Sequence, residues 1–174
     1  LLDLFWPEAV PDRFEALAIP FVAVATDYHR RSELRISSGP LTPAVAASMA
    51  IPGLVRPVTI GGQVLIDGGA SNPLPYDTMP PGIDLVIAVD CGGAAIHPDT
   101  ERHVPDPVEA MLGASQILMN RLVQRMIERE PPGLLIRPPV DSFGGLDFAH
   151  AREIMAAGDS MLDDVKRRVE AAIA

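Results

Sequence analysis

The chain has 174 residues, of which 48% are hydrophobic, so it is long enough to bury the core of one domain or of a large part of one. Its 14 basic and 23 acidic side chains give a net charge of -9, which argues against nucleic acid as a partner because phosphate binding needs clustered Lys and Arg. Apolar runs break before the roughly 18 residues of a transmembrane helix, and no signal-peptide pattern opens the chain. We therefore expect a cytoplasmic protein or one bound peripherally to a membrane.

Neither a metal site nor a disulfide is indicated. The single cysteine, Cys91, has no internal partner and is interpreted as a small apolar residue at a strand end. The histidines His29, His97, His103 and His150 have no Glu or His at metal-binding spacing, so we interpret them as solvated. The sequence therefore predicts no metal and no cofactor.

The first predicted elements are a buried strand and a short helix. Residues 20–26 are nearly all apolar, which is typical of a strand covered on both faces in a parallel sheet. Asp27 follows this run and is expected at the carboxyl edge of the sheet, where open α/β sheets hold ligands. The Ala-rich segment 43–50 predicts a short buried helix, ended by Pro52 and Gly53.

A β-hairpin is predicted next. Residues 58–60 and 63–66 are β-prone and are separated by Gly61 and Gly62, which adopt the positive φ angles of a two-residue turn at low cost. Asp67 follows the second strand directly and is itself followed by Gly68 and Gly69. From composition alone, Asp-Gly-Gly after a strand is most simply a turn.

The remaining elements complete an α/β pattern. Residues 85–89 predict a second buried strand, which ends at Asp90, so Asp90 is expected at the carboxyl edge of the sheet together with Asp27. Residues 107–129 predict an amphipathic helix that begins at Asp106 with a variant of the capping box; it would pack on the sheet, and the alternative is that it lies on a bilayer. Residues 134–136 predict a further strand, and residues 148–174 predict a helical segment with a break near Gly158.

The nucleophile elbow of an α/β hydrolase, Gly-x-Ser-x-Gly, is absent. Ser115 and Ser160 each follow a glycine by two positions, but the second glycine is missing and both serines lie in helical pattern. Both are interpreted as ordinary helix serines. No phosphate-binding glycine loop occurs either.

Several segments together resemble the patatin-like phospholipase family in order and spacing, and the resemblance is dense from about Phe14 to Asp90. The matching segments are residues 14–17 (Phe-Glu-Ala-Leu), 19–27 (Ile-Pro-Phe-Val-Ala-Val-Ala-Thr-Asp), 38–41 (Ser-Gly-Pro-Leu), 44–53 (Ala-Val-Ala-Ala-Ser-Met-Ala-Ile-Pro-Gly) and 65–69 (Leu-Ile-Asp-Gly-Gly) with Leu74-Pro75. The resemblance implies a patatin-like α/β fold, with a mainly parallel sheet flanked by helices and a β-hairpin before Asp-Gly-Gly. It also implies a lipid acyl hydrolase that acts on phospholipid, lysophospholipid or a related acyl ester.

In that family the aspartate of Asp-Gly-Gly pairs with a nucleophilic serine, so the resemblance implies that Asp67 is catalytic and that Gly68 and Gly69 form its motif. A carboxylate within reach of a serine hydroxyl can take its proton during attack and return it to the leaving alcohol. The chain departs from the family pattern at Val55-Arg56 and at Pro73, which affects packing near an acyl pocket and the loop beside Asp67.

The resemblance places the oxyanion loop and the serine elbow N-terminal to the matched region. We therefore expect residues 1–174 to be the C-terminal part of a single patatin-like domain, with the N-terminal half of the same domain as its partner and with no hydrolysis by this chain alone. The alternative hypothesis is a non-catalytic patatin-fold module that binds lipid or a protein. Peripheral contact with a membrane is compatible with both hypotheses.

Overall fold

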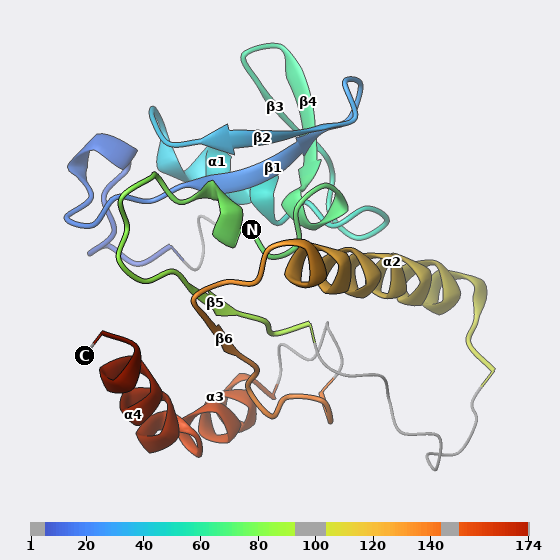
Figure 1. Ribbon diagram of the computed structural model, residues 1–174. Helices are drawn as coiled ribbons and strands as arrows, with labels where there is room; N and C mark the ends of the chain where they lie inside the picture. The colour runs from blue at the N-terminus through green and yellow to red at the C-terminus, as the bar shows by residue number, and fades with distance from the viewer. Residues whose placement is uncertain (1–5, 93–103, 144–149, 174) are drawn as a thin grey trace. The chain divides into compact units, whose positions relative to one another are not determined.

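The computed structural model describes residues 6–92, 104–143 and 150–173 (Figure 1). The chain divides into two compact units, Leu1–Pro73 and Leu74–Ala174. Both α-helices and β-sheets are present, in agreement with the mixed α/β class expected from the sequence.

The first unit is built on a four-stranded sheet in the order β2-β1-β4-β3. The strands are β1 (Ala23–Asp27), β2 (Ser32–Ile36), β3 (Val58–Ile60) and β4 (Gln63–Asp67), and every neighbouring pair is antiparallel. Ile60 lies opposite Gln63, and the two glycines between them have φ angles of 56° and 81°, in the region that favours glycine. A short 3₁₀ turn, η3 (Gly68–Ala70), follows β4 directly.

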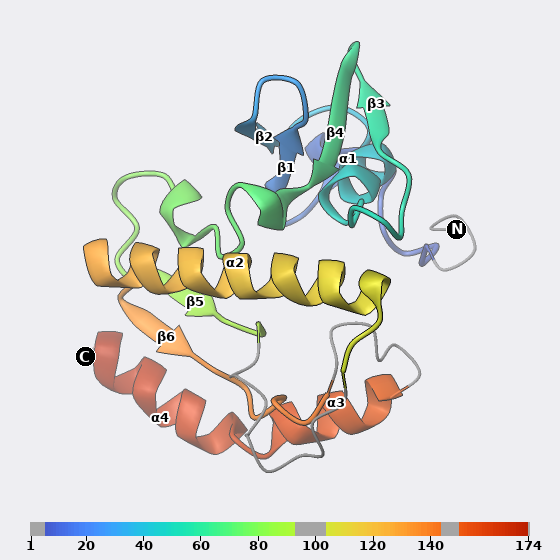
Figure 2. The ribbon, with the colours of Figure 1, turned by 90° about the vertical axis from the view of Figure 1, so that its right-hand side faces the viewer.

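Helix α1 (Leu41–Ser48) covers one face of this sheet (Figure 2). Ala44 and Ala47 are completely buried, and their small side chains let the helix backbone approach the strands closely. Ala25 and Leu65 pack with Ala47 in one core cluster. Because side chains alternate along a strand, Thr26 belongs to the opposite face of the sheet from Ala25.

The expectation of a mainly parallel sheet is wrong. Residues 28–31 join β1 to β2, and a link this short permits only an antiparallel pair, since parallel strands need a crossover of roughly a dozen residues. The buried strand predicted over residues 20–26 begins only at Ala23, and Pro20 and Phe21 before it are exposed. The apolar character of the strand itself does not come from a parallel sheet: β1 is a central strand and is buried along its whole length. No apolar run marks β2, but the alternation of polar and apolar residues over Ser32–Ile36 is the pattern of a half-buried edge strand.

In the second unit, β5 (Ile87–Val89) and β6 (Leu134–Ile136) form a two-stranded parallel ladder. Helix α2 (Pro107–Arg129) lies on one side of the ladder, and α3 (Ala151–Asp159) and α4 (Leu162–Ile173) lie on the other (Figures 1 and 2). The α2 side is held by a cluster of Leu74, Ala88 and Val123, and Arg168 of α4 donates to the Leu135 carbonyl oxygen at 2.7 Å. The second unit therefore has three layers: α2, the β5–β6 ladder, and α3 with α4.

The prediction of a buried strand over residues 85–89 is only partly correct. The strand begins at Ile87, and Ile87 and Val89 are 42% and 49% exposed. Ala88 is the buried residue of the three because it points toward the cluster with Leu74 and Val123, and the strand alternation turns its neighbours away.

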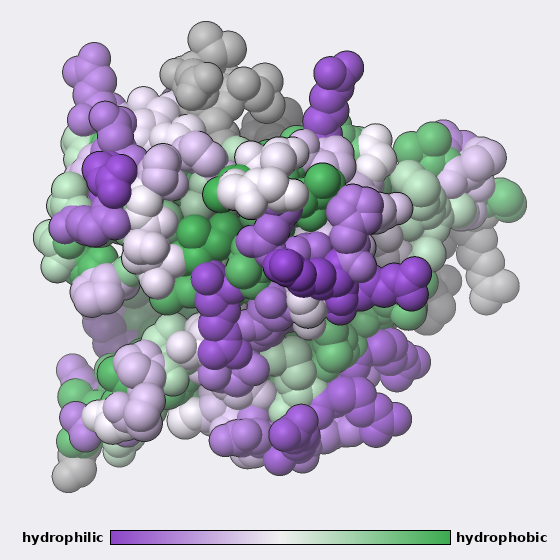
Figure 3. Space-filling view, turned by 90° about the horizontal axis from the view of Figure 1, so that it is seen from above, coloured by the Kyte–Doolittle hydropathy of each residue, from purple (hydrophilic) through white to green (hydrophobic). Residues whose placement is uncertain are grey.

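The predicted helix over residues 107–129 is confirmed as α2. Its contacts with the core cluster of Leu74 and Ala88 come from its C-terminal part. Val123 is its buried residue, whereas Ile117 and Leu118 are 63% and 70% exposed. Exposed apolar side chains occur elsewhere as well, and on the face drawn in Figure 3 hydrophobic groups lie beside strongly hydrophilic ones. The predicted break near Gly158 is confirmed, since α3 ends at Asp159 and α4 begins at Leu162. Phe148, the predicted start of the last helical segment, lies outside the described residues.

The start of α2 has a complete capping box. The Asp106 carboxylate accepts from the backbone N–H groups of Val108 and Glu109 at 2.8 and 3.0 Å, and Glu109 accepts in return from the Asp106 N–H at 2.9 Å. We expect Asp106→Ala to lower the free energy of unfolding by about 1 kcal/mol, because two backbone donors lose their acceptor. Urea denaturation measures this loss, and Asp106→Ser, which keeps an acceptor, serves as the control. Equal losses in both variants would contradict the capping role.

Candidate active site

Asp67 is the last residue of β4, which lies next to the central strand β1 with Asp67 opposite Ala25. Its backbone N–H donates to the carbonyl oxygen of Ala50, just beyond α1, at 3.0 Å. The side chain is half-buried. The sheet and the end of α1 therefore fix the backbone from which the Asp67 carboxylate projects.

The turn that follows Asp67 holds one of its carboxylate oxygens. Oδ1 accepts from the Gly69 N–H at 2.6 Å. Oδ2 accepts no hydrogen bond from any residue that the structure describes, and no salt bridge to Asp67 occurs in the same ranges. One oxygen is thus anchored and the other is open to a proton donor.

Gly68 allows the turn to pass over β1. A Cβ atom at this position would lie 2.2 Å from the Val24 carbonyl oxygen and 2.8 Å from its carbon, and both atoms belong to the backbone of a buried strand. The requirement for glycine at position 68 is therefore one of close approach, not of a positive φ angle.

Burial raises the pKa of the Asp67 carboxyl above its ordinary value, and the hydrogen bond from the Gly69 N–H opposes this shift. A carboxylate with a raised pKa binds a proton more readily. The environment of Asp67 therefore favours the exchange of a proton with a neighbouring hydroxyl group.

Asp27, the other acidic residue at the end of a strand in this unit, has a different environment. It is 3% exposed, and its Oδ1 accepts from the backbone N–H groups of His29 and Arg30 at 3.0 and 2.9 Å. Oδ2 accepts from Gln63 at 2.8 Å. Hydrogen bonds from the Arg30 backbone and Gln63 hold the pKa of Asp27 below its ordinary value, so this carboxylate stabilises the turn between β1 and β2 as a fixed anion.

Asp27 and Asp90 do not share a sheet edge, contrary to expectation. Asp27 ends β1 in the four-stranded sheet, and Asp90 follows β5 in the second unit. Asp90 is paired with Arg137 through an Nε–Oδ2 contact of 3.1 Å. The common edge was expected only because a single parallel sheet was expected. Since β1 and β5 belong to different sheets, this expectation is wrong as well.

The serines, cysteine and histidines have ordinary environments wherever the structure describes them. Ser115 donates to the Met111 carbonyl oxygen within α2, and Ser160 donates to the Ala157 carbonyl oxygen at the end of α3. Cys91 is exposed as a residue, but partial burial of its thiol and then the charge of nearby Asp90 raise its pKa, which disfavours the reactive thiolate. His29 and His150 are exposed, and His97 and His103 lie outside the described residues.

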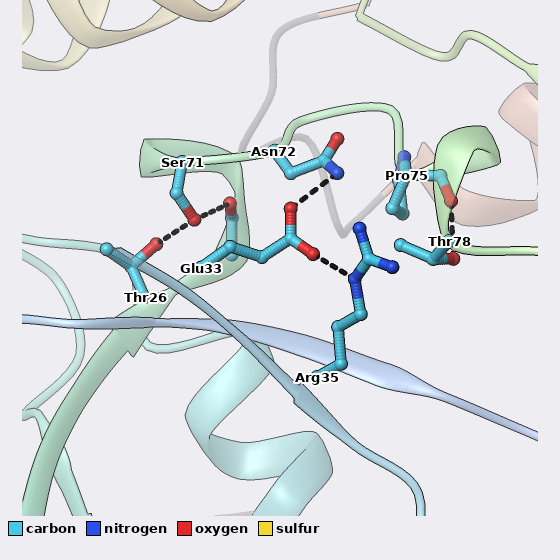
Figure 4. Close-up of polar contacts among 8 residues, drawn as sticks. Thr26, Glu33, Arg35, Ser71, Asn72, Pro75 and Thr78 are labelled. Atoms are coloured by element: carbon cyan, nitrogen blue, oxygen red, sulfur yellow. Dashed lines mark hydrogen bonds and ion pairs between the residues drawn. The ribbon is translucent and has the colours of Figure 1, made fainter. Parts of the chain in front are cut away.

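Two hydroxyl residues at the Asp67 turn were not singled out in the sequence. Thr26 and Ser71 contact each other through their side-chain oxygens at 2.8 Å (Figure 4). Thr26 also donates to the Asp67 carbonyl oxygen. Both line an open groove of about 640 Å³, together with Ile66 and Ala70. The only sequence signal for these residues is their position: Thr26 directly precedes Asp27, and Ser71 lies just after the Asp-Gly-Gly motif.

Comparison with known proteins shows a match between residues 1–79 and the family described as patatin-like phospholipase. Residues 1–79 of the chain belong to the patatin-like phospholipase family. The matched residues include β1, the sheet and the Asp67 turn described above. Among the described residues, no helix combines the length and apolar character needed to cross a membrane, and no cluster of His, Cys, Asp or Glu is suited to a metal ion.

Relatives of this patatin-like chain include bacterial and fungal proteins. An uncharacterized NTE family protein of Mycobacterium tuberculosis is 40% identical over 108 residues, which cover 60% of the chain and 30% of that protein. Lysophospholipases NTE1 of Debaryomyces hansenii and Aspergillus niger are each 30% identical, over 72% and 89% of the chain. The chain spans only 10% and 12% of the lengths of these two fungal proteins.

Proposed function

We propose that this chain carries the general base of a serine-type lipid acyl hydrolase, with Asp67 as the carboxylate of a Ser-Asp dyad. The observation that carries the proposal is the state of Asp67: half-buried, with a raised pKa, with one oxygen held by Gly69 and the other open among the described residues. The family match supports hydrolysis of a lipid, and the fungal relatives named lysophospholipase support a phospholipid or lysophospholipid substrate.

The nucleophile comes from outside these 174 residues in the proposed enzyme. Every serine of the chain lies in the described ranges, and none bonds to the Asp67 carboxylate. The chain spans 30% or less of the relatives cited above, and the proposal takes residues 1–174 as the C-terminal part of one patatin-like domain. The N-terminal part of that domain supplies the serine and the donors that stabilise the oxyanion.

The proposed reaction begins when the serine Oγ attacks the ester carbonyl carbon and its proton passes to Asp67. Collapse of the tetrahedral intermediate breaks the bond to the alcohol oxygen, which leaves with the proton from Asp67. Water then attacks the acyl-serine, Asp67 takes its proton, and the proton returns to the serine as the fatty acid is released. No metal or organic cofactor takes part.

A fluorophosphonate probe, which labels activated serines, tests the location of the nucleophile. We expect no labelling of the 174-residue chain, and labelling of one serine in the full-length protein, within a Gly-x-Ser-x-Gly segment. Heat-denatured protein controls for nonspecific reaction, and circular dichroism confirms that the short chain is folded. Labelling of Ser71, Ser115 or another serine of the chain would place the nucleophile here and refute the proposed division.

The alternative function, a non-catalytic module that binds lipid or protein, makes the opposite prediction for the full-length protein. In that case no serine reacts with the probe and no fatty acid is released from lysophosphatidylcholine. The same pair of measurements therefore separates the two functions.

A further inference from the structure

The Asp67 turn is tied to the central strand by a side chain from that strand. Thr26 of β1 is 6% exposed, and its Oγ1 lies 2.8 Å from the Asp67 backbone oxygen and 2.8 Å from the Ser71 Oγ. Figure 4 shows Thr26 and Ser71 pointing toward each other, from β1 and from the segment after β4. Three hydrogen-bonding groups from separate parts of the first unit thus meet at the backbone carbonyl of the residue that carries the proposed base.

The direction of these hydrogen bonds follows from the number of available protons. The Asp67 carbonyl oxygen can only accept, so the single hydroxyl proton of Thr26 goes to it. Ser71 must then be the donor in its contact with Thr26. Its other contact, to the Gly68 carbonyl oxygen, is longer at 3.3 Å, and that oxygen already accepts from the backbone N–H groups of Ser71 and Asn72. The result is a directed chain from Ser71 through Thr26 to Asp67.

We propose that Thr26 is the positioning residue of the Asp67 carboxylate, with Ser71 orienting the Thr26 hydroxyl. This inference rests on the proposed function of Asp67. The Asp67 peptide is held at its N–H by Ala50 and at its carbonyl oxygen by Thr26, and the carboxylate is held by the Gly69 N–H. Thr26 is the one side chain in this set, so it is the part that substitution can remove while the backbone contacts stay.

The expected consequence is catalytic, because a general base must lie within about 2.6–3.2 Å of the proton it abstracts. Loss of the Thr26 hydroxyl frees the Asp67 carbonyl and lets the turn shift. A displacement of about 1 Å can cost on the order of 100-fold in rate. Because the turn keeps its other two contacts, we expect a smaller loss in kcat, about tenfold, with little change in KM.

The experiment uses the full-length protein and a soluble acyl ester. Thr26→Val removes the hydroxyl at nearly constant shape, Thr26→Ser restores it, and Thr59→Val is the matched control, since Thr59 is an exposed threonine of the same sheet. We expect kcat to fall about tenfold in Thr26→Val and to stay within about threefold of wild type in Thr26→Ser and Thr59→Val. In an Asp67→Asn background, Thr26→Val should change the residual rate by less than about twofold, because no base remains to be positioned.

Two results would overturn the inference in different ways. A kcat of Thr26→Val within about threefold of wild type, while Asp67→Asn is inactive, refutes the positioning role and leaves the proposed function intact. Full activity of Asp67→Asn refutes the proposed function itself. If Thr26→Val does not fold, Ser71→Ala decides: a fall in kcat of about threefold or more with unchanged KM supports the directed chain, and an unchanged kcat refutes it.

Discussion

Replacement of Asp67 by Asn in the full-length protein is expected to lower kcat by about 100- to 10,000-fold, the contribution of general acid–base catalysis. The amide keeps the shape of the side chain and its oxygen can still accept from the Gly69 N–H, but it cannot take the serine proton. Release of fatty acid from lysophosphatidylcholine measures the loss. The exposed Asp77, also close to the Asp67 turn in the sequence, gives the control Asp77→Asn, which should keep wild-type turnover.

The stability of Asp67→Asn, unlike its activity, is not expected to fall. Because the pKa of Asp67 is raised in the folded protein, the folded state holds the proton more tightly than the unfolded state, and stability falls as pH rises from the ordinary carboxyl pKa through the raised value. Ionisation of the Asp67 carboxyl therefore costs stability in the folded protein, and asparagine removes this cost. We expect a melting temperature at pH 7 equal to or above that of wild type, and turnover of wild type that declines as pH falls through the raised pKa.

Asp27→Asn provides the contrasting case. Its lowered pKa means that the ionised carboxylate stabilises the fold above its ordinary pKa and that this contribution is lost as pH falls through the lowered value. Asparagine should therefore lower the melting temperature at neutral pH. For Asp67→Asn the decisive measurement is turnover: a value within about threefold of wild type would reduce Asp67 to a turn residue, since asparagine forms such turns equally well.

Gly68→Ala is expected to have the largest effect on stability, a loss of about 2–4 kcal/mol, because the added methyl group meets backbone atoms and not a flexible side chain. The contact of 2.2 Å with the Val24 carbonyl oxygen can be relieved only if the turn moves away from β1. This movement would displace Asp67 as well, so activity should fall with stability. Thermal unfolding and turnover of the full-length protein measure the two effects.

Gly113→Ala is the matched control for this substitution. Gly113 is an exposed residue in the N-terminal half of α2, and a Cβ there would meet no atom within 4 Å. Alanine should raise the free energy of unfolding by about 0.5–1 kcal/mol, through its better helix propensity. If Gly68→Ala is as well tolerated as Gly113→Ala, the close approach of the turn to β1 is not a constraint on the fold.

Local patterns in the sequence predicted much of the secondary structure. The capping residues Asp106 and Glu109 determine where α2 begins, because their side chains bond to backbone groups within three positions. The break between α3 and α4 and the strand at Leu134–Ile136 also follow from patterns within a few residues. The family was recognised for a related reason, since its motifs are short segments that keep their order along the chain.

The direction of the strands and the environment of Asp67 depended on contacts between distant residues. The apolar run that forms β1 indicates burial, but a central antiparallel strand and a parallel strand bury the same side chains, so the run does not determine its partners. The Asp-Gly-Gly motif identified Asp67 as a candidate, but its raised pKa comes from burial in the folded protein. The hydrogen bond from Thr26 to its carbonyl oxygen joins residues that are 41 positions apart in the sequence. The sequence determined which carboxylate to consider, and the tertiary structure decided the direction of its pKa shift and its position, because burial and long-range hydrogen bonds exist only once the chain has folded.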